Sequence, residues 1–144
     1  MEEEAVADAS VVAKWFLEED CSEQARGLRD SFVTGKVSLS VPSLVFYEVL
    51  NALWKSGQFS AEELALAARS LHKYGLRIWE PKGEIIEKTA ATAAREDISA
   101  YDAAYVALAR HLDAKLYTAD AELVAKFPGT AVHIREHAGG SGST

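Results

Sequence analysis

Short runs of apolar and β-branched residues alternate along this chain with longer segments in which apolar residues recur every three or four positions. The short runs are typical of buried strands, and the longer segments are typical of helices with one apolar face. Strands that alternate with helices favour an α/β fold with a mainly parallel sheet. Five strands are predicted, over residues 4–8, 37–42, 76–81, 114–120 and 130–136.

The segments between these strands predict helices, and several carry residues that are typical of helix ends. Ser43 is expected to cap one helix and Gly57 to close it. Ser60 and Glu63 have the spacing of a capping box, and Gly75 is expected to end the helix that they begin. The predicted helices cover residues 10–20, 22–35, 43–57, 60–75, 82–97, 98–112 and 121–127.

The composition is that of one globular domain. The 144 residues are 49% hydrophobic, which is enough to form a sizeable core. We assign residues 1–137 to this domain. The last seven residues, 138–144, are rich in Gly and Ser and are expected to be a flexible tail, either a linker or a remnant of cloning.

The same composition favours a cytoplasmic protein with no membrane span. No apolar stretch reaches the roughly 18 residues that a transmembrane helix needs. The N-terminus is acidic where a secretory signal would be basic. Cys21 is the one cysteine and cannot form an internal disulfide, which favours a reducing compartment.

The formal net charge of −7 argues against indiscriminate binding to the nucleic-acid backbone, which needs a basic surface. This charge does not exclude an enzyme that binds phosphates through metal ions. It would also suit a basic protein partner. The choice between these classes therefore depends on candidate sites.

Four acidic residues stand out, although each also has an ordinary structural explanation. Asp8 and Asp120 each follow a predicted strand, where an aspartate commonly caps the next helix. Glu48 lies inside a helix, and Asn51 follows on the same face, which could be a solvated stripe. Asp102 opens a nearly continuous apolar helix, so we expect it at the mouth of a buried element and not on an open surface.

Taken together, the four acids indicate a cation site. Three of them lie at strand-to-helix or loop-to-helix junctions of a predicted parallel sheet, where α/β proteins bind ligands. Carboxylates that converge without a counter-ion repel one another and raise their own pKa values. A divalent cation relieves this repulsion, and Mg²⁺ or Mn²⁺ prefers such oxygen ligands.

The sequence resembles PIN-domain ribonucleases, and specifically the VapC toxins of VapBC toxin–antitoxin pairs. The resemblance spans roughly residues 4–135, and four motifs carry it in order. These are ADASVVAKWF with Asp8 and Ser10, VPSLVFYEVLNAL with Glu48 and Asn51, SAYDAAYVALA with Asp102, and LYTADAEL with Thr118 and Asp120.

The resemblance implies a three-layer α/β/α sandwich and an endoribonuclease that cleaves single-stranded or structured RNA with metal-activated water. It implies that Asp8, Glu48, Asp102 and Asp120 hold Mg²⁺ or Mn²⁺ and that Ser10, Asn51 and Thr118 support the site. It also implies a cognate antitoxin and a homodimer, for which the apolar segments 44–54 and 64–71 are candidates.

Other conspicuous residues receive structural interpretations. His72 and His111 are expected on the surface, and a strand would hold His133 and His137 apart. Most of the conspicuous aromatic residues are expected to pack in the core or at interfaces. Lys14 and Lys55 lie near the candidate ligands and could contact phosphate, but solvated surface lysine is the favoured interpretation.

Three alternatives stay open from the sequence. A PIN-type nuclease could act in RNA processing outside a toxin system. A receiver-like signalling domain would also bind Mg²⁺, but residues 77–81 lack its phospho-accepting aspartate and residues 130–136 lack its lysine. A catalytically silent interaction domain would use the four acids only as caps and surface groups.

Overall fold

In the computed structural model, which describes residues 3–137, five strands form one sheet. All neighbouring strands are parallel, and their order across the sheet is β3-β2-β1-β4-β5. The predicted tail, residues 138–144, lies outside the described residues. The strands are β1 (Glu3–Ala7), β2 (Val37–Pro42), β3 (Arg77–Trp79), β4 (Lys115–Thr118) and β5 (Ala131–His133).

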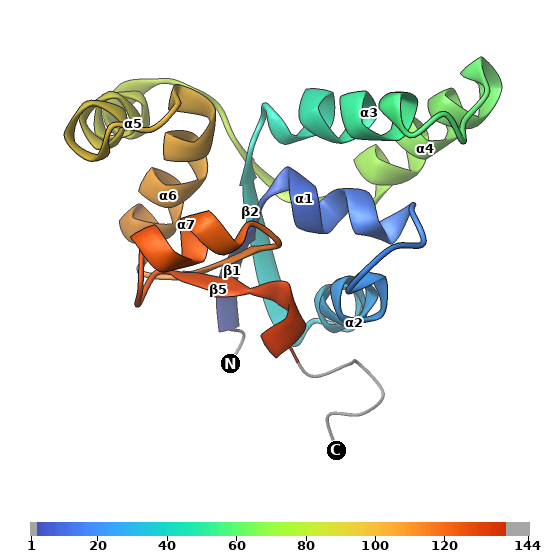
Figure 1. Ribbon diagram of the computed structural model, residues 1–144, viewed down its shortest axis with the longest axis horizontal. Helices are drawn as coiled ribbons and strands as arrows, with labels where there is room; N and C mark the ends of the chain where they lie inside the picture. The colour runs from blue at the N-terminus through green and yellow to red at the C-terminus, as the bar shows by residue number, and fades with distance from the viewer. Residues whose placement is uncertain (1–2, 138–144) are drawn as a thin grey trace.

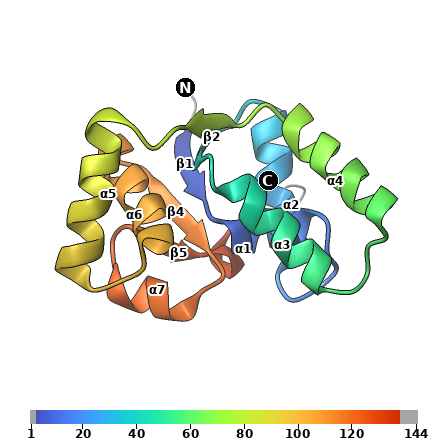
Figure 2. The ribbon, with the colours of Figure 1, turned by 90° about the horizontal axis from the view of Figure 1, so that it is seen from above.

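Helices cover the sheet on both faces. Helices α5 and α6 lie on one side of the sheet, and α1 to α4 lie on the other (Figure 1, Figure 2). The predicted three-layer α/β/α architecture is therefore confirmed. Within residues 3–137 the helices are α1 (Ala9–Val12), α2 (Ser22–Val33), α3 (Val45–Lys55), α4 (Ala61–Lys73), α5 (Gly83–Glu96), α6 (Ala100–Leu112) and α7 (Ala121–Lys126).

The two-sided cover explains the composition of the central strands. Strands that are buried on both faces need apolar residues at consecutive positions instead of an alternating pattern. Strand β1 meets this requirement with the buried run Ala5–Ala7, and β2 is buried over Leu39–Val41 with one polar residue, Ser40, between two apolar ones. Helix α6 packs directly on β1, β2 and β4, and α5 packs on the outside of α6.

Several predicted helix ends are confirmed by their geometry. The Ser60 hydroxyl accepts from the backbone N–H of Glu63, and the Glu63 carboxylate accepts from the N–H of Ser60, which completes the capping box. Gly57 and Gly75 have φ of +75° and +71° directly after α3 and α4. This left-handed backbone is the one that ends helices at glycine.

The predicted helix over residues 10–20 is wrong in its length. Helix α1 ends at Val12, and a single 3-10 turn (Ala13–Trp15) follows it. The chain then turns, because the Ser22 hydroxyl donates to the carbonyl of Leu17 and accepts from the N–H of Glu19. These contacts fix the loop before α2 and leave no room for further helical turns.

Two other boundaries differ from the predictions. Ser43 is not the cap of α3, since the cap position is Leu44 and no side chain bonds there. The backbone N–H of Ser43 instead donates to the carbonyl of Trp79. The last strand ends at His133, where the chain enters a 3-10 turn (Ile134–Glu136) instead of continuing as a strand.

The strand order places a topological switch point between β1 and β4. From β1 the chain proceeds to β2 and β3 on one side, and it then crosses back to β4 and β5 on the other side. In open α/β sheets, ligands bind outside the carboxyl ends of the strands at such a point. Asp8 directly follows β1, and Asp120 lies two residues after β4.

No helix in residues 3–137 is long and apolar enough to cross a membrane.

Candidate functional site

Asp8 is a buried carboxylate at the end of β1. It caps α1, and its Oδ1 accepts from the Ser10 hydroxyl at 2.5 Å and from the backbone N–H of Val11 at 3.3 Å. The Thr118 hydroxyl is a further hydrogen-bonding partner. Burial nevertheless raises the pKa of Asp8 from 3.8 to about 6, because these hydrogen bonds offset only part of the desolvation.

Two hydroxyls connect the ends of β1 and β4. Besides donating to Asp8, Ser10 Oγ accepts from the backbone N–H of Ala119 at 2.9 Å. Thr118 is fully buried, and its Oγ1 accepts from the N–H of Asp120 at 3.0 Å. Ser10 and Thr118 therefore connect the backbone and side chains around Asp8 and Asp120, just after two neighbouring strands.

Glu48 faces the same region from α3. Its side chain is half-buried, and Oε1 accepts from the Tyr105 hydroxyl at 2.6 Å. Burial raises the pKa of Glu48, the Tyr105 hydrogen bond lowers it, and the nearby charge of Asp102 raises it. Asn51 is exposed one turn later and lines the same surface hollows as Glu48.

Tyr105 is the site residue that the sequence interpretation missed. It is 3% exposed, and the pKa of its hydroxyl lies well above the usual range because of burial, the bond to Glu48 and the charges of Glu48 and Asp8. The group is thus a hydrogen-bond donor between two of the predicted ligands. One signal was available: a buried tyrosine hydroxyl needs a partner, and Tyr105 lies three residues after Asp102.

Asp102 and Asp120 complete the group from the first turn of α6 and the start of α7. Partial burial and then the charge of Asp120 raise the pKa of Asp102. Asp102 is exposed, so the prediction that it does not lie on an open surface is wrong, whereas most of the α6 residues after it are buried as predicted. Asp120 Oδ1 caps α7 by accepting from the N–H groups of Glu122 and Leu123, at 2.9 and 3.4 Å.

The four acids therefore share one region, and no cation balances them within residues 3–137. The charges of Asp8 and Glu48 both raise the pKa of Tyr105. The charge of Asp102 raises the pKa of Glu48, and the charge of Asp120 raises the pKa of Asp102. None of the four forms an ion pair in the part of the chain described. The roles of Asp8 and Asp120 as helix caps coexist with this convergence.

The chemistry of these donors fits Mg²⁺ or Mn²⁺, because all are carboxylate oxygens. The described residues contain no set of three or more His, Cys, Asp or Glu side chains placed to chelate one ion. These carboxylates therefore fit a cation that takes few protein ligands and completes its coordination shell with water, as Mg²⁺ commonly does.

The other candidates identified in the sequence have structural partners. His111 is half-buried, not a surface group, with its ring 5.5 Å from that of Trp79 and Nδ1 2.8 Å from Lys88 Nζ. His133 Nδ1 accepts from the N–H of Arg135. Trp15 packs edge-on against Tyr74, as predicted, whereas Tyr47 and Trp54 are exposed and do not pack in the core of this chain.

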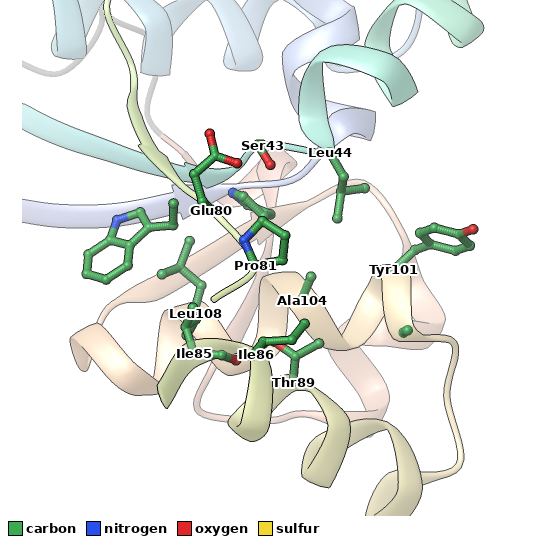
Figure 3. A pocket seen from close by; sticks show the side chains of 13 residues that line it. Ser43, Leu44, Glu80, Pro81, Ile85, Ile86, Thr89, Tyr101, Ala104 and Leu108 are labelled. Atoms are coloured by element: carbon green, nitrogen blue, oxygen red, sulfur yellow. Dashed lines mark hydrogen bonds between the residues drawn. The ribbon is translucent and has the colours of Figure 1, made fainter. Parts of the chain in front are cut away.

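A partly open pocket of about 190 Å³ lies beside the acidic region, and its lining is mostly apolar. Figure 3 shows it between the β2–α3 and β3–α5 loops and helices α5 and α6. Ile85, Ile86 and Leu108 contribute apolar surface, and the Thr89 hydroxyl is already bonded to the carbonyl of Ile85. This lining suits an apolar group and not a metal ion or a phosphate.

A PIN domain family model matches residues 5–127, which include all four acids. The chain belongs to the PIN-domain family. Ribonuclease VapC3 of Pyrobaculum aerophilum is 34% identical over 128 residues, which cover 85% of this chain and 94% of VapC3. The resemblance seen in the sequence is therefore confirmed, and the receiver-like alternative is excluded.

Solved structures share the fold of this chain. The crystal structure of PAE2754 from Pyrobaculum aerophilum has a TM-score of 0.65 at 29% identity. The match covers 94% of this chain and 92% of the PAE2754 chain. A toxin–antitoxin complex from Klebsiella pneumoniae has a TM-score of 0.61 at 19% identity, over 90% and 97% of the two chains. The second likeness concerns the fold alone.

Proposed function

We propose that this PIN domain is the toxin of a VapBC-type toxin–antitoxin pair and an endoribonuclease that depends on Mg²⁺ or Mn²⁺. One observation carries the proposal: four carboxylates from four separate elements lie around the switch point of the sheet without a balancing cation among the described residues. Asp102 interacts with Glu48 and Asp120, and Tyr105 interacts with Glu48 and Asp8. The name of the relative VapC3, a ribonuclease, supports the reaction class. A cytoplasmic location is part of the proposal.

In this proposal Asp8, Glu48, Asp102 and Asp120 line the site of the divalent cation, which would take its ligands from part of this group and from water. The bound cation would supply an activated water and stabilise charge on the phosphate and the leaving oxygen. The chain itself orients the ligands. Ser10 fixes Asp8, and the Tyr105 hydroxyl fixes Glu48 and favours its ionised form, since it donates to the carboxylate.

The decisive experiment compares two aspartates on the same helix. Asp102→Asn is expected to lower Mn²⁺-dependent RNA cleavage by at least about 100-fold while the fold is retained, because it removes a charge that we assign to the cation site. Asp113→Asn is the matched control. Asp113 ends α6 with φ of +52°, which asparagine tolerates well, and it is expected to leave cleavage unchanged.

Chelation of the metal is expected to abolish cleavage by the unchanged protein. A circular single-stranded RNA tests the endonuclease assignment, because it offers no ends to an exonuclease. Undiminished turnover by Asp102→Asn would remove that residue from the site. Cleavage that survives complete chelation would overturn the metal-dependent mechanism.

An antitoxin is the proposed protein partner, and the surface suggests how it would bind. The chain carries a net charge of −7, and the four acids lack a balancing cation in the described residues, so a basic segment suits the site. The adjacent apolar cavity offers a place for an apolar side chain of the same segment. The toxin–antitoxin complex from Klebsiella pneumoniae, which has a similar fold, supports this kind of pairing.

A further inference from the structure

We propose that a polar groove between α1 and α3 binds the RNA phosphate next to the scissile one, with Lys55 as its cationic contact. The inference rests on the proposed nuclease function and names a substrate subsite for it. The α1–α3 groove is a hollow of about 650 Å³ whose lining includes Ser10, Lys14, Glu19, Glu48, Asn51 and Lys55.

The groove begins at the acidic site. Ser10, which bonds to Asp8, and Glu48 both line it. Glu48, Asn51 and Lys55 follow one another on α3 at spacings of three and four residues, so they share one face of the helix. Lys55 lies about 10 Å farther along α3 than Glu48, given the helix rise of about 1.5 Å per residue. In the proposed complex, Lys55 would therefore contact the phosphate next to the scissile one.

The two lysines of the groove have different roles. Lys14 is 7% exposed, so its predicted character as a solvated surface lysine is wrong. Its Nζ lies 3.0 Å from Glu19 Oε2, which neutralises its charge. Lys55 is exposed, and no carboxylate among residues 3–137 pairs with it. Lys55 is thus the cation in the groove that can bind a ligand.

The electrostatics of the site explain why such a cation is needed. A bound metal ion would neutralise the scissile phosphate, but the neighbouring phosphates would meet a protein of net charge −7. A second hollow also contains Glu48, but it is lined by Leu44, Tyr47, Leu50, Trp54 and other residues without a positive charge. Of these two hollows, the α1–α3 groove is the one that suits an RNA backbone.

The first test measures binding of a single-stranded RNA by fluorescence anisotropy in the Asp102→Asn background, where the RNA stays intact. Lys55→Gln is expected to weaken binding roughly fivefold and to reduce the salt dependence of log K by about 0.7, the contribution of one single-strand phosphate contact. Lys55→Arg is expected to restore both. Lys36→Gln is the matched control, because Lys36 is exposed at the opposite end of the sheet, just before β2.

The second test uses cleavage by the otherwise unchanged protein. Lys55→Gln is expected to raise KM roughly fivefold and to leave kcat unchanged, since Lys55 does not touch the reacting atoms. A neutral methylphosphonate at the one adjacent position that Lys55 contacts is expected to raise KM similarly. Combining it with Lys55→Gln is expected to add little, because both changes remove the same contact.

The outcomes separate this inference from the proposed function. If the parent protein cleaves RNA but Lys55→Gln has an unchanged KM and an unchanged salt dependence, the phosphate subsite is wrong. The proposed nuclease function is then unaffected. Loss of antitoxin binding by Lys55→Gln with unchanged RNA binding would assign the groove to a protein and also overturn the subsite. Absence of any RNA cleavage by the parent protein would instead refute the proposed function.

Discussion

Asp8 illustrates at the scale of a single residue how a structural and a catalytic role can coincide. It caps α1, which is the ordinary explanation for an aspartate at a strand-to-helix junction. It is also 8% exposed, with a pKa raised to about 6 by burial and with no ion-pair partner in residues 3–137. A cap requires neither the burial nor the missing counter-charge, so a substitution can separate the two roles.

Asp8→Asn is expected to stabilise the metal-free protein at pH 7 and to abolish RNA cleavage. The folded state binds the Asp8 proton more tightly than the unfolded state, so the wild type loses stability as pH rises from about 4 to 6. The loss amounts to at most about 3 kcal/mol, since each pKa unit corresponds to about 1.4 kcal/mol. Asparagine keeps the accepting oxygen of the cap without the charge.

Urea unfolding in the presence of a chelator measures this effect at pH 4 and pH 7. The free energy of unfolding of the variant is expected to exceed that of the wild type clearly at pH 7, and the two values are expected to agree near pH 4. A variant that is less stable at pH 7 would identify Asp8 as a structural cap alone.

Tyr105→Phe removes the donor that stabilises the ionised form of Glu48. The pKa of Glu48 is expected to rise, and Mn²⁺ affinity is expected to fall about tenfold, as for other groups that orient metal ligands. The acidic limb of the pH–activity profile is expected to move to higher pH. Isothermal titration calorimetry measures the affinity.

Tyr117→Phe is the control for that variant. Tyr117 is also a buried tyrosine, but the nearby charge that raises its pKa is Glu3 and not Glu48. Equal Mn²⁺ affinity and equal pH profiles for Tyr105→Phe and the wild type would show that Tyr105 does not position Glu48.

At the scale of elements, the sequence predicted best where local chemistry decides the structure. Apart from the shortened α1, the predicted strands and helices occur among the described residues near their predicted positions, because hydrophobic periodicity indicates which face of an element is buried. The capping box at Ser60 and Glu63 needs only contacts within one turn. The early end of α1 could not be predicted, because a side chain of α2, that of Ser22, bonds to the loop that replaces the helix.

The capping box makes a prediction for α4. Ser60→Ala is expected to cost about 1 kcal/mol in the free energy of unfolding, because the N–H of Glu63 loses its acceptor. Ser70→Ala is the control, since Ser70 is exposed inside the same helix, where alanine is favoured. Urea unfolding followed by circular dichroism compares the two. A loss no larger for Ser60→Ala than for Ser70→Ala would refute the capping contribution.

At the scale of the whole molecule, the features that the sequence could not predict are those that depend on contacts between distant segments. Periodicity predicts strands but not their order, and only the order β3-β2-β1-β4-β5 makes Asp8 and Asp120 neighbours at the switch point. The bond from Tyr105 to Glu48 spans 57 residues, so the sequence can signal that a buried Tyr105 hydroxyl needs a partner but not that the partner is Glu48. The ordered set of acids could be recognised because family resemblance carries information about the fold that no single motif contains.

The proposed homodimer also belongs to this scale. Tyr47, Trp54 and Leu66 are 78%, 55% and 55% exposed on α3 and α4, which makes an apolar surface on these two helices. We expect a dimer in sedimentation velocity and a monomer for Trp54→Glu. Val33→Glu changes an equally exposed residue on α2 and is expected to remain dimeric. A monomeric wild type, or a dimeric Trp54→Glu, would contradict this interface.

The central claim is that four carboxylates distributed over the chain form one cation site. Anomalous X-ray scattering from a crystal grown with Mn²⁺ tests it most directly, because it locates the ion without reference to activity. We expect a peak within about 2.6 Å of an Asp8 oxygen and of a carboxylate oxygen of at least one of Glu48, Asp102 and Asp120. A peak bound elsewhere, or none at saturating Mn²⁺, would contradict the account.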